Sequence, residues 1–248
     1  MKARYTYVVS DIHGQYELFK KLLEVIDFSD SDVMYILGDI IDKGNKSLKL
    51  IDYIRKKENI ICILGNHEYE FLKYYDRLTK EYCDKTDEVL KKLQNYFNDD
   101  YKLSWDIVDY IDSLPPIIIT DRFIGVHAGM EVDKEKRILP LEEQSINHLV
   151  YDRHFKDIDI INPFKRPIII GHTPCFYDNE SGEFIKSPNN GSKNIYDYYK
   201  IRIDSGVVYT NMLGALRLED MKEIYVSNKI AIQSNNQKWA SWNKLAFF

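Results

Sequence analysis

Five short motifs in this sequence combine glycine with aspartate, asparagine or histidine, residue types that bind divalent metals. In chain order their chemical residues are Asp11 and His13, Asp39 and Asp42, Asn66 and His67, His127, and His172. Carboxylate, amide and imidazole groups suit borderline or hard dications, and the set lacks the thiolates of a structural zinc site. The set therefore indicates a catalytic metal centre.

Each motif alone has an ordinary explanation as a turn, a helix cap or a buried core histidine. Their joint occurrence favours chemistry, because four of the six histidines fall in these motifs, each near a glycine that permits close backbone approach. Two dications balanced by only two carboxylates, Asp11 and Asp39, would leave roughly two positive charges. Such a pocket suits a phosphate dianion.

The elements that must position these motifs read as alternating strands and helices over the first third of the chain. Strands are predicted at residues 5–10, 33–37 and 60–64, with helices at 15–26 and 47–57 between them. This β-α-β-α-β unit implies parallel strands. The first three motifs directly follow its strands, and side chains at the carboxyl edge of a parallel sheet converge on one site.

The rest of the chain continues this pattern after an interruption. Residues from Glu68 to about Leu114 read as two or three polar helices inserted after the third strand, where we expect them to lie beside the site. Residues 178–194 have the composition of a surface excursion. Further strands are predicted at residues 117–119, 123–126, 167–170, 201–203, 215–218 and 224–226, and His127 and His172 follow two of them.

Length and composition limit the function classes. We expect a single domain over residues 1–248 with a helical insertion at about 68–114. A net charge of −5 and a pI near 5.7 argue against nucleic acid as a partner. Three cysteines without CxxC spacing, no secretory signal and no long apolar run predict a cytoplasmic protein without membrane contact. The tail aromatics, Trp239, Trp242, Phe247 and Phe248, are expected to cover a core edge.

As an ordered set, the motifs resemble those of the phosphoprotein phosphatase family of calcineurin-like metallophosphoesterases, particularly its small bacterial and phage members. SDIHGQY is similar to the family's GDxHG, GDIIDKG to GDxxDRG, ILGNHE to RGNHE, HAG to HGG, and GHTP to the final GH motif. Residues 203–218 are similar to the closing strands of these proteins. The resemblance implies an α/β (α+β) fold, a sandwich of two mixed β-sheets flanked by helices, and a metal-dependent phosphoesterase activity.

The resemblance also implies roles for individual residues. Two divalent ions, expected to be Mn²⁺ with Fe²⁺, Zn²⁺ or Mg²⁺ as alternatives, would activate a bridging water for direct attack on the phosphate. His67 would protonate the leaving oxygen while Asp42 orients its ring. The implied metal ligands are Asp11, His13, Asp39, Asn66, His127 and His172, with Asp39 bridging, and the implied phosphate-binding residues are Arg153, Lys43 and Asn66.

The family's three phosphate-binding arginines are only partly present. Arg153, in VYDRHF, matches one of them, and Lys43 replaces another with loss of the two-pronged guanidinium geometry. Leu64 replaces the third and keeps no charge. We therefore expect weak binding of phosphate monoesters.

Two substrate classes remain open. The leading hypothesis is a serine/threonine protein phosphatase with a phosphorylated protein as partner, supported by the Asp42 and His67 pair and by Arg153. The alternative is a bis(5'-nucleosyl)-tetraphosphatase acting on diadenosine tetraphosphate or a similar small phosphoester, because that group also has LGNH and HAG, although it usually lacks the second aspartate of GDxxD. An inactive binding module is disfavoured, since every ligand is intact.

Overall fold

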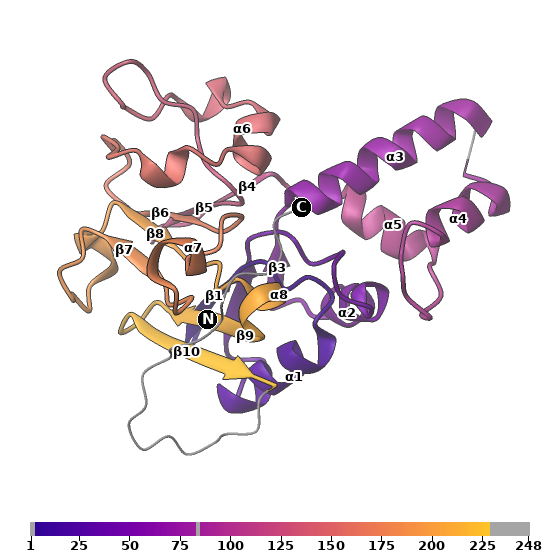
Figure 1. Cartoon of the computed structure of the whole chain (residues 1–248), viewed down its shortest axis with the longest axis horizontal. Coiled ribbons are helices and arrows are strands. Elements are labelled where there is room, and N and C mark those ends of the chain that lie inside the picture. Colours follow the sequence, from indigo (N-terminus) through magenta and orange to yellow (C-terminus); the bar gives the residue numbers. More distant parts are fainter. Residues whose placement is uncertain (1–2, 83–84, 229–248) are drawn as a thin grey trace.

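Two mixed five-stranded β-sheets pack against each other in the computed structural model, which describes residues 3–82 and 85–228 (Figure 1). The strand order is β10-β9-β1-β2-β3 in the first sheet and β4-β5-β6-β8-β7 in the second. Helices flank both sheets. The expected α/β (α+β) sandwich of two mixed β-sheets is therefore confirmed.

The first sheet contains the predicted β-α-β-α-β unit. Its strands are β1 (Thr6–Val9), β2 (Val33–Ile36), β3 (Ile60–Cys62), β9 (Met212–Arg217) and β10 (Lys222–Ser227). Strands β1, β2 and β3 are parallel, and β9 adds antiparallel to β1. The crossovers are α1 (Tyr16–Val25) and α2 (Ser47–Ile54), which bury rows of apolar side chains, as their spacing requires.

The second sheet consists of β4 (Ile117–Ile119), β5 (Ile124–Val126), β6 (Ile168–Ile170), β7 (Ile185–Ser187) and β8 (Lys200–Arg202). Strands β5, β6 and β8 are parallel, with β4 and β7 antiparallel at the edges. Strand β7 lies within residues 178–194, where composition indicated only a surface excursion. Its three half-buried residues are too few to show an alternating pattern.

Three helices separate β3 from β4, as the polar helical stretch predicted. They are α3 (Asn66–Tyr82), α4 (Asp87–Gln94) and α5 (Trp105–Asp112), and α3 begins inside the third motif. Figure 1 shows α3 and α4 extending to one side of the two sheets. The division into one domain with an insertion at 68–114 stays a prediction.

The remaining short helices are α6 (Ile146–Tyr151), α7 (Phe176–Asn179), α8 (Val207–Thr210) and the 3₁₀ turns η1 (Leu141–Glu143), η2 (Phe155–Asp157) and η3 (Ile195–Asp197).

An apolar layer between the sheets holds them together. It includes Val8 from β1 and Leu216 from β9 on one side, with Ile169 from β6 and Ile201 from β8 on the other. A second core cluster lies between the first sheet and its helices, and a third covers the second sheet. Burial on both faces explains the continuous apolar runs of the parallel strands. The apolar layer between the sheets also fixes the carboxyl ends of the two sets of parallel strands relative to each other.

Some predictions fall on residues outside the described part of the chain. These are Cys83 and the aromatic tail residues Trp239, Trp242, Phe247 and Phe248. The other two cysteines, Cys62 and Cys175, are buried free thiols. Among residues 3–82 and 85–228, no helix combines the length and the hydropathy that a bilayer-spanning segment requires.

Candidate metal centre

The predicted ligands lie where parallel strands of the two sheets end. Asp11 and His13 follow β1, Asp39 follows β2, Asn66 follows β3, His127 follows β5 and His172 follows β6. Five of these side chains are buried, and Asn66 is half-buried. The two sheets thus contribute to one polar site at their shared edge, as expected for strand ends in such folds.

One group of ligand atoms comes from Asp39, Asn66, His127 and His172. The Nε2 atom of His127 lies 3.3 Å from Oδ1 of Asp39, 3.0 Å from Oδ1 of Asn66 and 3.2 Å from Nδ1 of His172. The other nitrogen of His127, Nδ1, lies 2.8 Å from the carbonyl oxygen of Leu37 and must donate its proton there. Nε2 therefore directs a lone pair at other acceptors, an arrangement that a cation between them makes favourable.

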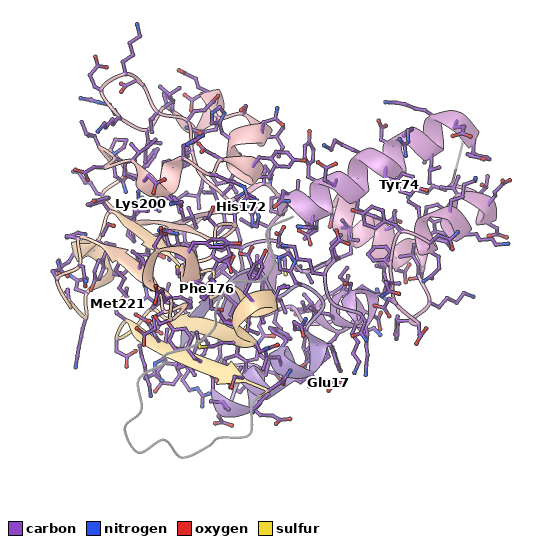
Figure 2. All side chains as sticks on the ribbon, in the orientation of Figure 1. Glu17, Tyr74, His172, Phe176, Lys200 and Met221 are labelled. Atoms are coloured by element: carbon purple, nitrogen blue, oxygen red, sulfur yellow. The ribbon has the colours of Figure 1, made fainter. Side chains whose placement is uncertain are left out.

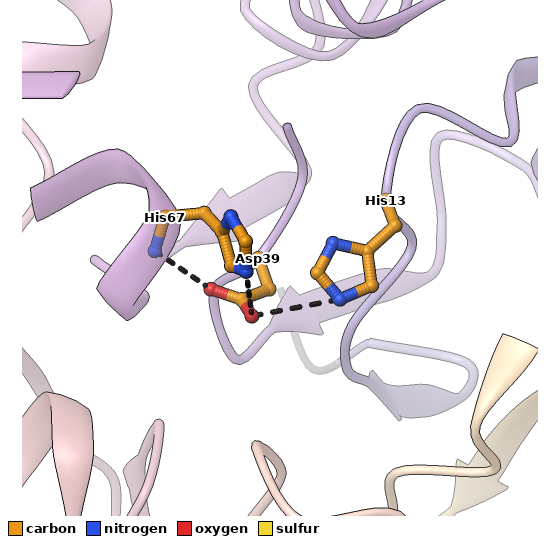
Figure 3. A group of neighbouring side chains, drawn as sticks. All are labelled: His13, Asp39 and His67. Atoms are coloured by element: carbon orange, nitrogen blue, oxygen red, sulfur yellow. Dashed lines mark hydrogen bonds and ion pairs between the residues drawn. The ribbon is translucent and has the colours of Figure 1, made fainter. Parts of the chain in front are cut away.

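A second group comprises His13, Asp39 and His67 (Figure 3). The Nδ1 atom of His13 lies 3.0 Å from the carbonyl oxygen of Ile41 and donates its proton there, so Nε2 carries the lone pair; Nε2 lies 3.6 Å from Oδ2 of Asp39 and accepts a hydrogen bond from Nζ of Lys43 at 2.9 Å. Oδ1 of Asp39 faces the first group and Oδ2 faces the second. The Asp39 carboxylate thus lies between two clusters of ligand atoms, as in a dinuclear centre.

The charge of these groups also fits bound cations. Burial, together with the neighbouring carboxylates of Asp11 and Glu68, raises the pKa of Asp39 well above its usual value. Burial lowers the pKa of His13 and of His172 to about 3. Both imidazoles are therefore neutral and can bind metal, while the Asp39 carboxylate needs positive charge nearby to remain ionised. The donor set fits divalent ions, and its geometry does not select among Mn²⁺, Fe²⁺, Zn²⁺ and Mg²⁺.

Asp11 links the two sheets at this site without joining either group of ligand atoms. Its Oδ2 atom accepts a hydrogen bond from the backbone N–H of His172 at 3.0 Å and another from the hydroxyl of Ser10. It is nevertheless close enough to Asp39 to raise the pKa of that carboxyl. A ligand role for Asp11 stays a prediction.

The site backbone is held in conformations that most residues avoid. Of the twelve non-glycine residues with positive φ in the described chain, six belong to the site: Asp11, His13, Asp39, Asp42, Lys43 and His172. Such geometry costs free energy and persists only where the surroundings enforce it. Glycines supply the necessary room, since a Cβ atom at Gly65 would overlap Asp39 and one at Gly171 would overlap Asp11.

Glu68 is one residue whose importance the motifs did not reveal. Its buried carboxylate accepts hydrogen bonds from four backbone N–H groups at 2.8 to 3.0 Å, those of Asp39, Ile40, Ile41 and Gly65. It therefore fixes the Asp39 loop against the start of α3. The sequence showed a glutamate after His67 but gave no sign that its partners would be main-chain donors.

Asp204 is a second such residue, and the strand-end rule would have found it. It lies two residues after the end of β8, is buried, and lines a cavity together with His13, Lys43 and His172. Burial, followed by the charge of Asp11, raises the pKa of Asp204 well above its usual value. Together with Asp11 and Asp39, Glu68 and Asp204 place four buried carboxyl groups around the centre. Two bound dications would therefore leave at most the two positive charges that were expected from Asp11 and Asp39 alone.

The predicted catalytic pair is assembled. The Nδ1 atom of His67 donates to Oδ2 of Asp42 at 2.7 Å, and its Nε2 lies 3.8 Å from Oδ2 of Asp39. Burial opposes protonation, but Asp42 and Asp39 outweigh it and raise the pKa of His67 above its usual value. Tyr96, from the segment after α4, donates its hydroxyl to Asp42 at 3.3 Å. The sequence did not single out this tyrosine among the many of the inserted helices.

The three positions compared with family arginines have different surroundings. Arg153 and Lys43 line the same cavity as His13 and His172, and Nζ of Lys43 lies 2.9 Å from Nε2 of His13. Arg153 is exposed and forms no hydrogen bond or ion pair with any described residue, so it is available to a ligand. Leu64 is only 5% exposed and packs in the largest core cluster. The expectation that the missing arginine at Leu64 weakens monoester binding stays a prediction.

Comparisons of the sequence with known proteins agree on one family. A model of the calcineurin-like phosphoesterase family matches residues 5–227. A symmetrical bis(5'-nucleosyl)-tetraphosphatase of Wigglesworthia glossinidia brevipalpis is 35% identical over 129 residues, which is 50% of this chain and 44% of that protein. The chain thus spans about half the length of the curated relatives it matches.

Solved structures share the fold at lower identity. A provisionally assigned diadenosine tetraphosphatase superposes with a TM-score of 0.62 and 19% identity, covering 90% of this chain and 92% of the other. A serine/threonine phosphatase of Saccharomyces cerevisiae superposes with a TM-score of 0.53 and 15% identity, covering 93% and 82%. The fold alone does not choose between these two substrate classes.

The Glu68 contacts predict a large effect of a small substitution. In Glu68→Gln, an amide NH₂ replaces one carboxylate oxygen and faces two backbone donors, so two buried hydrogen bonds are lost. We expect a loss of about 3 kcal/mol in the free energy of unfolding, measured by urea titration, and a lower metal content.

Glu70→Gln is the matched control, because Glu70 is exposed and pairs with Lys73 on the helix surface. That variant should lose less than about 1 kcal/mol. Similar losses for the two variants would show that Glu68 does not hold the Asp39 loop.

Proposed function

We propose that this chain, which belongs to the calcineurin-like phosphoesterase family, hydrolyses dinucleoside polyphosphates. The named activity of its relatives, symmetrical bis(5'-nucleosyl)-tetraphosphatase, supports this substrate class. It also corresponds to the alternative that the LGNH and HAG motifs left open. The serine/threonine protein phosphatase hypothesis has less support from the relatives.

The structural observation that carries the proposal is the position of Arg153 between two cavities. One cavity contains His13 and His172 of the metal centre. The other, of about 640 Å³, lies beyond Arg153 and is lined by residues that include Met130, Leu139 and Ile158. A substrate cleaved at an internal phosphate must extend to both sides of the reacting phosphorus. The 640 Å³ cavity offers room for one arm, and the small cavity at the metal centre, of about 40 Å³, marks the side on which the other arm would extend.

The proposed chemistry is phosphoryl transfer directly to water. When bound, two divalent cations supply the Lewis-acid charge for that transfer. The chain's own residues then have separate tasks: Asp11, His13, Asp39, Asn66, His127 and His172 hold the cations, and Arg153, Lys43 and Asn66 hold phosphoryl oxygens. Arg153 suits this role because its unpaired guanidinium can grip two oxygens at once.

His67 would hold the proton for the leaving oxygen at Nε2, because its Nδ1 is committed to Asp42. A nucleoside diphosphate is stable as an anion near neutral pH and needs little protonation. A serine or threonine alkoxide needs it strongly. The intact Asp42 and His67 pair is therefore the specific observation that favours a second candidate function, hydrolysis of phosphoserine or phosphothreonine in proteins.

A direct comparison of substrates tests the proposal. With Mn²⁺ present, kcat/KM should be measured for diadenosine tetraphosphate, a phosphoserine peptide and a phosphotyrosine peptide. We expect the dinucleotide to be preferred by at least about tenfold, with ADP as product. Preference for the phosphoserine peptide would replace the proposal with the second candidate, and the absence of dinucleotide cleavage would refute it.

The role of His67 predicts a dependence on the leaving group. His67→Asn should slow hydrolysis of an alkyl phosphate by about a hundredfold or more while affecting p-nitrophenyl phosphate much less, because nitrophenolate leaves without protonation. Metal content, determined in parallel, should not change. Asp42→Asn should shift the ratio of the two rates in the same direction. Equal losses on both substrates would mean that His67 serves the metal centre instead.

A further inference from the structure

The cavity at the metal centre has an aromatic end that the proposed chemistry does not use. Besides His13, Lys43, Arg153 and His172, it is lined by Tyr177 and Tyr209. Each of these two tyrosines is 56% exposed, although large aromatic side chains usually contribute to cores. An exposed aromatic pair that lines the same cavity as cationic side chains indicates a ligand-binding surface.

Both tyrosines are carried by segments that also supply site residues. Tyr177 lies in α7, five residues after His172, and Tyr209 lies in α8, five residues after Asp204. Figure 2 labels His172 and, four residues later in the chain, Phe176, the residue before Tyr177. The position of the tyrosines relative to the metal centre is therefore set by the same strand ends.

The rings of Tyr177 and Tyr209 contact each other. The ring centroids of Tyr177 and Tyr209 are 5.9 Å apart, and Phe176 lies nearly parallel to Tyr209, with an interplanar angle of 8°. Helix α8 is held at its end, where the hydroxyl of Thr210 donates to the carbonyl oxygen of Ser205 at 3.1 Å. Rings fixed in this way lose little further freedom when a planar ligand stacks on them.

We infer that Tyr177 and Tyr209 form a stacking site for the nucleobase of one arm of the substrate, an inference that rests on the proposed function. A nucleotide has an anionic end and a flat aromatic end, and the cavity offers Arg153 and Lys43 to the first and the tyrosine rings to the second. Stacking tolerates every base, because each base has a π-face. The site therefore selects a nucleotide over an inorganic polyphosphate without selecting one base.

Equilibrium binding of two simple probes tests this inference. ADP and pyrophosphate should be titrated calorimetrically into the Mn²⁺-loaded wild-type protein and into Tyr177→Ala and Tyr209→Ala. We expect the Kd of ADP to rise about tenfold in each variant, equivalent to about 1.4 kcal/mol, while the Kd of pyrophosphate stays unchanged. Tyr177→Phe and Tyr209→Phe should bind ADP like the wild type, since they keep the ring.

Tyr196→Ala is the matched control, because Tyr196 is 52% exposed and belongs to η3, outside the residues that line this cavity. It should leave both Kd values unchanged. The stacking site is refuted if the alanine variants bind ADP normally, or if they lose affinity for ADP and pyrophosphate equally.

Failure of the stacking site and failure of the proposed function give different results. If the wild type cleaves diadenosine tetraphosphate but neither Tyr177→Ala nor Tyr209→Ala changes the Kd of ADP, only the stacking site is refuted. If the wild type does not cleave the dinucleotide while ADP binding depends on the rings, the substrate class is wrong and a nucleotide site remains. Stronger dependence of phosphotyrosine peptide binding on the rings would assign them to a peptide side chain.

Discussion

The Asp39 carboxylate, with one oxygen directed at each of two clusters of ligand atoms, is the contact on which the rest of the site depends. Asp39, His13 and His127 are all buried, with acceptor atoms facing one another at 3.3 to 3.6 Å, and the donors nearest to them are Nζ of Lys43 at His13 and the backbone N–H of His67 at Asp39. Such a cluster is unfavourable without cations, because burial penalises each charge and the acceptors repel. Bound metal therefore stabilises the fold as well as enabling the chemistry, in line with coupling between metal binding and folding.

The sandwich provides what this contact requires. Parallel strands of both sheets end at one edge, and an apolar layer between the sheets fixes the two sets of ends relative to each other. Glu68 then holds the Asp39 loop through four main-chain donors, while Tyr96 brings the inserted helices to Asp42. The proposed stacking site would be built on the same strand ends, through α7 after β6 and α8 after β8.

The sequence was enough to predict nine of the ten described strands and the residues that gather at the site, because these depend on local pattern and on the strand-end rule; β7 was missed. It missed Tyr96, whose partner Asp42 is far away in the chain, and Glu68, whose partners are main-chain donors that leave no trace in residue type. Asp204 was missed although its strand had been predicted, since an aspartate before serine and glycine also reads as a turn. The burial of Leu64 depends on the direction in which its side chain points, and no motif specifies that direction.

The central claim is that two cations share Asp39. The most direct measurement is anomalous X-ray scattering from crystals of the wild-type protein grown with Mn²⁺. The account predicts two anomalous peaks on opposite sides of the Asp39 carboxylate, one beside Nε2 of His13 and the other beside Nε2 of His127. A single peak, or peaks only at other positions, would contradict the dinuclear centre.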